Sequence, residues 1–247
     1  MKLNCDLGES YGAWKMGQDE QVMPLIDMAN VACGFHAADP MVIRHTLALA
    51  AEHKVEVGAH PSYYDLAGFG RRSIPHSTDE IEALMLYQLG ALDGMCRGQG
   101  LELSYVKPHG ALNNDMMKDS EILAAVMKAV RSFRAGLPLM VPVSLAYKTH
   151  QALAAQLGVP LLLEAFADRA YDDQGLLVSR QHPGAVLHEP DQIVRQALSF
   201  TRQGGVTSIS GQWLELPAHS LCVHGDNEAA LEAVRAIRAA IGRAGEA

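Results

Sequence analysis

Side chains that can gain or lose a proton recur in this chain where short apolar runs end. Six runs show the pattern, and each closes on a cluster of acids, bases, glycine or proline. The runs are residues 2–9, 28–36, 55–61, 103–110, 161–169 and 221–226. A buried parallel strand exposes functional groups at its carboxyl end, and in an α/β barrel all these ends open onto one face. The pattern predicts a multistep enzyme, because a binding scaffold would not need so many groups that transfer protons.

Alternation along the strands indicates which side chains share that face. Strand side chains alternate with period two, so Asn4 and Asp6 point together, away from the apolar residues between them. We expect the polar set to face the barrel lumen or its mouth. The catalytic candidates are Asp6, His60, Lys107, His109 and Glu164. The binding candidates, including those on loops, are Asn4, Glu9, Asn30, His36, Arg71, Arg72, Asp168, Arg169, Arg180, His224 and Asp226.

The segment 107–110, with the sequence KPHG, carries the most specific local signal. Its proline fixes the backbone and lacks an N–H donor, so it ends the strand's hydrogen bonding and splays Lys107 and His109 toward the cavity. The simplest alternative is a surface lysine. However, a lysine directly after an apolar strand is expected to be partly buried and to need a charged partner. Asp6 or Glu164 could supply it.

Arginines on two loops are candidate anion sites. The loop GFGRR after the third run presents Arg71 and Arg72, whose planar guanidinium groups suit phosphate. The alternative is a solvated loop pinned by a salt bridge. Arg169 and Arg180 flank a polar excursion, where either could pair with a substrate carboxylate or with a nearby aspartate. The sequence HGD at 224–226 could place an anion at the start of the last helix.

A metal centre is an open alternative for the histidines. The leading candidate ligands are Asp6, His60 and His109, and His36 and His224 could join them in a zinc-like site built from separate strands. Neither H-E-x-x-H nor H-x-x-x-H spacing occurs. The motif G-x-x-x-x-G-K-[ST] is also missing, which excludes a P-loop nucleotide site.

The four cysteines form no C-x-x-C pair. They are Cys5, Cys33, Cys96 and Cys222. We expect them to be small buried side chains in a reducing cytoplasm. Cys33, near a strand end, is the least implausible catalytic thiolate.

Composition limits the partners. A chain of 247 residues that is 49% hydrophobic suits one globular domain over residues 1–247, and this length is usual for a single (β/α) barrel. The formal charge of -8 argues against nucleic acid or an anionic membrane as the main partner. With neither an apolar run long enough to span a bilayer nor a secretion signal, we expect a cytoplasmic protein.

Helical periodicity follows the apolar runs. The predicted helices are 40–54, 78–97, 120–135, 146–157, 191–203 and 227–243, and a short strand at 139–143 brings the strands to seven. Strands that alternate with helices indicate parallel β-α units. We predict an α/β fold, a closed but irregular seven-stranded parallel barrel, with an open doubly wound sheet as the alternative. Hairpin additions are expected near 170–190 and 205–218.

Several motifs together resemble the LamB/YcsF family, and the match runs nearly from end to end. The motifs are NCDLGES at 4–10, NVACGFHA at 30–37, GAHPSY at 58–63, GFGRR at 68–72, VKPHGAL at 106–112, FADR at 166–169 and CVHGD at 222–226. Tyr64, Asn113 and Ala165 depart from the family pattern, but none of these changes removes an ionisable group.

The resemblance implies a barrel similar to those of glycoside hydrolases and deacetylases. It also implies a reaction in which 5-oxo-L-proline, ATP and water give L-glutamate, ADP and phosphate. This chain would be the A component of such a 5-oxoprolinase, together with two further subunits, B and C. Transfer of the γ-phosphoryl group to the lactam oxygen would activate the ring for attack by water.

Under this hypothesis, Lys107, Arg71 and Arg72, with Mg²⁺, neutralise the charge of the phosphate. Asp6 and Glu164 act as acid and base or hold metal. His60 and His109 donate to the developing oxyanion. Arg169 would hold the substrate carboxylate.

Two other functions remain open at this point. A metal-dependent amide or polysaccharide deacetylase would contain zinc and hydrolyse its substrate without ATP. A non-catalytic regulator would bind a lactam or a sugar without turnover. The sequence also leaves open whether this chain forms a homo-oligomer.

Overall fold

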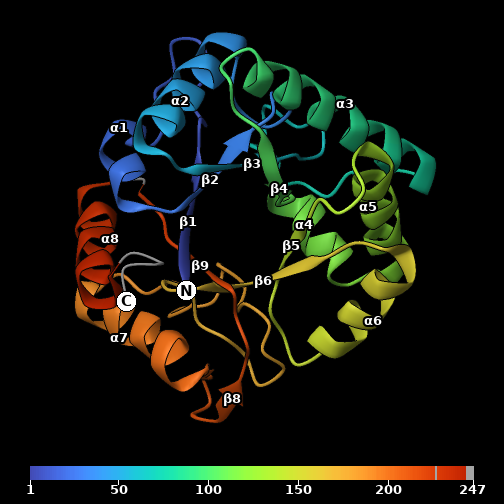
Figure 1. Ribbon diagram of the computed structural model, residues 1–247. Coiled ribbons are helices and arrows are strands. Elements are labelled where there is room, and N and C mark those ends of the chain that lie inside the picture. Colours follow the sequence, from blue (N-terminus) through green and yellow to red (C-terminus); the bar gives the residue numbers. More distant parts are fainter. Residues whose placement is uncertain (226, 243–247) are drawn as a thin grey trace.

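Seven parallel strands form a closed barrel at the centre of the computed structural model, which describes residues 1–225 and 227–242 (Figure 1). The order around the barrel is β1-β2-β3-β4-β5-β6-β9, and β9 pairs with both β6 and β1. The strands are β1 (Lys2–Leu7), β2 (Met28–Ala32), β3 (Glu56–His60), β4 (Leu103–Val106), β5 (Leu139–Pro142), β6 (Leu161–Phe166) and β9 (Ser220–Cys222). The predicted barrel is confirmed, and the open doubly wound sheet was the wrong alternative.

Helices surround the barrel, as Figure 1 shows. The six predicted helices are present as α2 (Pro40–His53), α3 (Thr78–Arg97), α5 (Ser120–Phe133), α6 (Tyr147–Leu157), α7 (Pro190–Leu198) and α8 (Glu228–Ile241). A π-helical turn, Ser199–Gln203, continues α7. Three short segments were not predicted, and they are α1 (Asp19–Val22), a 3-10 turn at Met23–Leu25 and α4 (Gly110–Met116).

Both regions expected to hold hairpin additions contain antiparallel pairing. Strands β7 (Gly205–Thr207) and β8 (Trp213–Glu215) form a two-stranded sheet outside the barrel. In the excursion after β6, Tyr171 bridges Leu177. These additions leave the barrel ring intact, because β6 pairs directly with β9.

Local sequence signals explain where the helices begin. Asp39 caps α2 by accepting hydrogen bonds from two backbone N–H groups of its first turn, and Pro40 occupies the first helical position. Ser77 and Glu80 form a reciprocal capping box at the start of α3. Asn227 caps α8 by accepting a hydrogen bond from the N–H of Ala230.

Two packing environments follow from the alternation of side chains along the strands. The apolar residues at odd positions of β1 are buried in the main core between strands and helices. A small separate apolar cluster packs inside the barrel, and it consists of Met28, Tyr105 and Met140 with Leu162 against them. We call this cluster the lumen floor. Met28, Tyr105 and Leu162 each stand two residues before a polar side chain of the site, so the cluster excludes water beneath those polar groups.

The barrel is irregular on one side. Strands β4 and β5 are aligned at a single register pair, Val106 with Leu139, whereas β2 and β3 are aligned at five. The register of β3 against β4 shifts between Val57 and Gly58. There the Tyr105 ring packs so closely on Gly58 that a Cβ would lie 2.2 Å from it. Glycine is thus required for this ring to fill the lumen.

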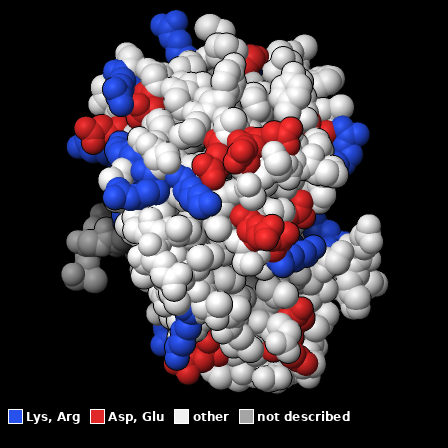
Figure 2. Space-filling view, turned by 90° about the vertical axis from the view of Figure 1, so that its right-hand side faces the viewer, with Lys and Arg blue, Asp and Glu red and all other residues white. Residues whose placement is uncertain are grey.

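The surface carries mixed charge on the face drawn in Figure 2, where small groups of acidic and basic side chains lie side by side among uncharged residues. Among the helices in the described part of the chain, none combines the length and apolarity that crossing a bilayer requires.

Candidate active site

Lys107 lies buried in the barrel lumen between two carboxylates. Its Nζ is 2.8 Å from Asp6 Oδ1 and 2.8 Å from Glu164 Oε1. Asp6 comes from β1, Glu164 from β6, and Lys107 directly follows β4. The side chains of Lys107 and Glu164 are 4% and 1% exposed. A lysine after an apolar strand therefore has the charged partners that its position predicted, and both candidates contribute.

The electrostatics of this group favour fixed charges. Burial by itself would lower the pKa of Lys107, but Asp6 is the first of several neighbours that raise it well above 10.5. Burial would raise the pKa of Asp6, yet His60 and Lys107 hold it well below 3.8. At neutral pH, Lys107 is a cation and Asp6 an anion. This favours charge stabilisation over proton exchange as the role of Asp6.

Buried side-chain amides fix the orientation of Asp6. Asn30 Nδ2 donates to Asn4 Oδ1 at 2.8 Å and to Asp6 Oδ1 at 2.7 Å. Tyr105 Oη donates to Asn30 Oδ1 at 2.6 Å, and Asn4 Nδ2 donates to Ser220 Oγ at 2.7 Å. Both asparagines are fully buried. The structure therefore brings Asn4 and Asn30 to the site as supports for Asp6 rather than as groups exposed to a ligand.

Three histidines and Glu9 converge beside Asp6. The rings of His36 and His109 stack with centroids 3.7 Å apart, and His60 Nε2 lies 2.9 Å from His109 Nδ1. Glu9 Oε1 is 3.1 Å from His36 Nε2 and 3.7 Å from His109 Nδ1. Asp6 Oδ2 lies 3.3 Å from His60 Nε2. We call Glu9, His36, His60 and His109 the histidine cluster.

Backbone carbonyls fix the orientation of two of these rings. His60 Nδ1 lies 2.7 Å from the carbonyl oxygen of Lys107, and His109 Nε2 lies 2.9 Å from that of Phe69. A carbonyl oxygen only accepts, so each ring donates an N–H there. In the neutral ring, the other nitrogen carries a lone pair, and in both histidines that nitrogen faces the cluster.

A serine orients the third ring. His36 Nδ1 lies 3.0 Å from Ser62 Oγ, whose hydroxyl donates to the carbonyl oxygen of Tyr63 at 2.9 Å. Ser62 therefore accepts from His36, and the lone pair of His36 also faces the cluster. Burial, reinforced by neighbouring histidines, keeps the pKa of His36 and of His109 well below 6.5. At neutral pH the inward nitrogens of His36 and His109 are therefore acceptors.

The loop after β3 closes over the cluster through two glycines. Gly70 has a φ of +64°, and a Cβ there would lie 2.7 Å from His109 Cδ2 and 2.8 Å from His36 Cβ. Gly110 has a φ of +55°, and its Cβ would lie 2.4 Å from the carbonyl oxygen of Gly70. That oxygen accepts from the N–H of Ala111 at 2.8 Å. Glycine at both positions lets the loop and the start of α4 approach each other.

The two arginines of this loop differ in their surroundings. Asp65, which is buried, accepts hydrogen bonds from Arg72 and from the N–H of Gly68. Arg72 is thus pinned by a salt bridge, as the alternative interpretation of the loop predicted. Arg71 is exposed, with Cζ 5.1 Å from the centre of the Phe69 ring, and it forms no ion pair within the described ranges. Of the two, Arg71 is the one available to an anion.

A cavity of about 260 Å³ brings together three further candidates, Asp168, Arg180 and His224. His224 Nδ1 lies 2.7 Å from Asp168 Oδ2. Burial would raise the pKa of Asp168, but His224 lowers it below 3.8. His224 also acts electrostatically on Asp6 and Glu9.

Two candidates, Arg169 and Cys33, do not join the site. Arg169 is buried and donates to the carbonyl oxygens of Val178 and Ala185 at 2.7 and 3.3 Å, so its guanidinium group holds the excursion together. Asp226 lies outside the described residues. Burial raises the pKa of Cys33 to about 12, which leaves no thiolate at neutral pH.

Sequence reasoning missed two supports of the site. Asp65 stands three residues before Gly68, and this spacing is typical of an aspartate that caps its own turn. That signal could have identified Asp65 as the residue that shapes the loop. Ser62 carries no comparable signal, because its contact with His36 joins residues that follow different strands.

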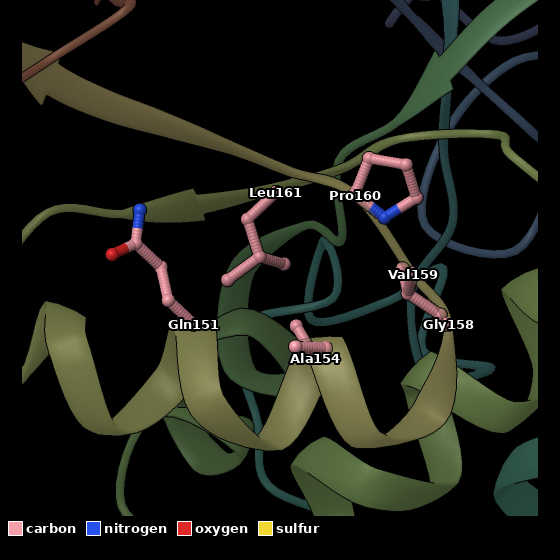
Figure 3. Close-up of a pocket in the computed structure, with 7 residues that line it drawn as sticks. Gln151, Ala154, Gly158, Val159, Pro160 and Leu161 are labelled. Carbon is pink, nitrogen blue, oxygen red and sulfur yellow. The ribbon is translucent and has the colours of Figure 1, made fainter.

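A separate hollow of about 340 Å³ lies between α6 and the start of β6 (Figure 3). Gln151, Ala154 and Leu161 are among its lining residues, and none of the residues that line it is ionisable. Leu161 begins β6, so the hollow lies at the amino end of that strand, whereas the catalytic candidates gather at the carboxyl ends. The hollow offers no group for acid–base or phosphoryl chemistry.

The geometry and the sequence motifs agree with a family comparison. The model of the LamB/YcsF family matches residues 1–247. The chain belongs to the LamB/YcsF family. Its relatives include the 5-oxoprolinase A component of Chromohalobacter salexigens, which is 56% identical over 236 residues, 96% of this chain and 94% of the relative. The 5-oxoprolinase A component of Pseudomonas fluorescens strain Pf0-1 is 53% identical over 97% of this chain and 96% of its own.

Solved structures support the fold of this LamB/YcsF chain. The lactam utilization protein from Thermus thermophilus superimposes with a TM-score of 0.91 and 41% identity, covering 98% of this chain and 95% of that one. A protein from Enterococcus faecalis reaches a TM-score of 0.51 at 11% identity, over 94% and 83% of the two chains. This second likeness concerns the barrel fold alone, and it confirms the predicted type of barrel.

Proposed function

We propose that this chain is the A component of an ATP-dependent 5-oxoprolinase, which opens 5-oxo-L-proline to L-glutamate as ATP is hydrolysed to ADP and phosphate. The observation that carries the proposal is the 56% identity to a 5-oxoprolinase A component over nearly the whole of both chains. The grouping of ionisable residues at one mouth of the barrel supports a catalytic part in that reaction.

The chemistry explains why ATP is needed. A lactam amide is a poor electrophile, and closure of a five-membered ring is favoured. Phosphorylation of the lactam oxygen gives ADP and an activated imidate phosphate. Addition of water then breaks the ring C–N bond as the nitrogen takes up a proton, and a second water releases phosphate from the resulting acyl phosphate. Each step mainly requires positioning and neutralisation of charge.

Different residues of the site would contribute to different parts of this reaction. Lys107 supplies a buried positive charge that Asp6 and Glu164 hold in place, which suits stabilisation of a developing oxyanion or a phosphoryl group. Exposed Arg71 would contact nucleotide phosphate, with Mg²⁺ accompanying ATP. The cavity at Asp168 and its neighbours is of a size and polarity that suit a small cyclic amino acid.

Partner subunits belong to the proposal. Relatives named as one lettered component of 5-oxoprolinase imply an enzyme of several subunits, and we expect subunits B and C to be needed for the complete reaction. The decisive experiment measures phosphate and glutamate release from this chain, with and without B and C, in the presence and absence of 5-oxoproline and ATP.

The expected result is glutamate formation that requires this chain, ATP and the partner subunits together. If the complete mixture forms no glutamate, the proposed function is wrong. Hydrolysis of an amide or acetyl substrate by this chain alone, without ATP, would favour the deacetylase-like function instead. Binding of 5-oxoproline with no turnover in any mixture would favour a regulator.

A further inference from the structure

We propose that Glu9, His36, His60 and His109 bind one divalent transition-metal ion of the zinc class. The four side chains each offer a ligand atom, and these atoms all lie within 4.8 Å of one another. They come from the segments that follow β1 and β2, the end of β3 and the segment that follows β4. The ligand set differs from the one that the sequence alone suggested, since Glu9 takes the place of Asp6 and His224 beside the three histidines.

The separations of the ligand atoms suit a shared ion. Metal–ligand bonds of about 2.0–2.1 Å in a tetrahedron place ligand atoms about 3.3 Å apart. His60 Nε2 to His109 Nδ1 is 2.9 Å, and Glu9 Oε1 is 3.1 Å from His36 Nε2 and 3.7 Å from His109 Nδ1. These three distances bracket the ideal value, and the remaining pairs, which reach at most 4.8 Å, would have to shorten by movement of side chains.

The outward hydrogen bonds are those of metal-binding histidines. Such a histidine almost always donates its second N–H to a carbonyl, a carboxylate or a similar acceptor, which fixes the ring and turns the lone pair to the metal. Here the acceptors are the carbonyl oxygens of Lys107 and Phe69 for two rings, and Ser62 Oγ for the third. All three lone pairs consequently meet, with a carboxylate oxygen beside them.

Acceptors that face one another at these distances repel unless a proton or a metal ion lies between them. The cluster presents three imidazole lone pairs and the Glu9 carboxylate, and Asp6 Oδ2 adds another acceptor 3.3 Å from His60 Nε2. Histidine nitrogen favours zinc, iron, cobalt or nickel over Mg²⁺, which prefers oxygen ligands. The Mg²⁺ that accompanies ATP would therefore bind elsewhere. In the 5-oxoprolinase reaction the ion would polarise the lactam carbonyl beside Lys107, and only this role rests on the proposed function.

The test measures metal directly on the purified chain, without 5-oxoproline, ATP or partner subunits. The chain is stripped with a chelator and dialysed against Zn²⁺ or Co²⁺, and bound metal is counted by mass spectrometry. We expect one ion per chain and, with Co²⁺, visible absorption bands of a site of low coordination number. Glu9→Gln and His109→Asn should each weaken binding about 10- to 100-fold or more.

Two variants separate coordination from folding. Ser62→Ala removes the acceptor that orients His36 without removing a ligand, and about a 10-fold weaker binding is expected, with unchanged circular dichroism. His45→Ala, at an exposed histidine outside the cluster, should bind metal as the original chain does.

A folded chain that retains no metal, or one whose metal binding is the same in the Glu9 and His109 variants, would overturn the proposed metal site. Neither result depends on glutamate formation, so the metal site and the proposed function fail separately.

Discussion

Lys107 and Asp6 form a 2.8 Å ion pair across the lumen, from strands that are not neighbours in the barrel. Strands β2 and β3 separate β1 from β4, so the pair spans the interior rather than one edge of the sheet. Glu164 reaches the same Nζ from β6. The position of the cation is therefore set by closure of the whole ring, and damage to the barrel would displace it.

Replacement of Lys107 by Met should abolish glutamate formation by the assembled enzyme. It should also destabilise the chain by about 3–5 kcal/mol, because two carboxylates would remain buried without a cation. Urea unfolding of the isolated chain and turnover in the complete mixture measure the two effects.

A double variant separates these effects. Lys107→Met combined with Glu164→Gln removes one of the stranded carboxylates, so it should recover part of the stability and none of the activity. Recovery of turnover in the double variant would show that Lys107 takes no part in the chemistry.

Gly70→Ala should disturb the site more than the fold. A Cβ at this position would press on His36 and His109, and a φ of +64° is itself strained for alanine. The matched control is Gly136→Ala, whose φ is +80° and whose Cβ would meet no atom within 4 Å. Both should lose about 1 kcal/mol of stability from backbone strain, but only the Gly70 variant should lose turnover. Equal turnover in the two variants would contradict the close packing.

The two loop arginines should respond differently to alanine. Arg71→Ala should raise the KM for ATP about 10-fold, as expected for loss of a charge-assisted contact to phosphate. Arg72→Ala should instead loosen the loop that Asp65 holds, and limited proteolysis would detect faster cleavage near residues 65–72. The reverse assignment, with Arg72 governing KM, would place the nucleotide on the other side of the loop.

Asp168 provides a prediction about pH. Its pKa is lowered below 3.8 in the folded chain, so its pairing with His224 stabilises the fold above pH 3.8, and this contribution is lost as pH falls through the lowered value. Asp168→Asn should therefore destabilise the chain by about 1–3 kcal/mol at neutral pH. The difference from the original chain should shrink as pH falls below 3.8. Glu52→Gln, at an exposed helical residue, serves as the control and should show a small difference throughout.

The cysteines should resist thiol reagents in the folded chain. All four are buried, and burial raises the pKa of Cys33 and of Cys96 to about 12. At about pH 8, a disulfide reagent should react slowly until guanidinium chloride unfolds the chain, and then with all four thiols. Fast reaction of one thiol in the folded state would reopen the case for a reactive cysteine.

Much of the barrel could be predicted because its signals are local. Alternation in β1 correctly separated Asn4 and Asp6 from the apolar core, and Asp39 marked the start of α2. The path of the Arg169 side chain could not be predicted, since its partners Val178 and Ala185 lie in an irregular excursion. Contacts between residues of separate segments depend on closure geometry, which local pattern does not contain.

The same limit applies to the histidines. Their types and their places at strand ends predicted a shared site, and His60 and His109 indeed meet. Their tautomers follow from carbonyls supplied by Lys107 and Phe69, and no spacing along the chain encodes those contacts. The donor role expected for these rings stays a prediction.

The single register pair between β4 and β5 has a consequence for how heat would inactivate this protein. A closed sheet has no free edge at which a neighbouring molecule can add a strand. Separation of β4 from β5 would create two such edges at once, beside Lys107. On heating, catalytic activity should therefore be lost at the same temperature at which aggregation begins.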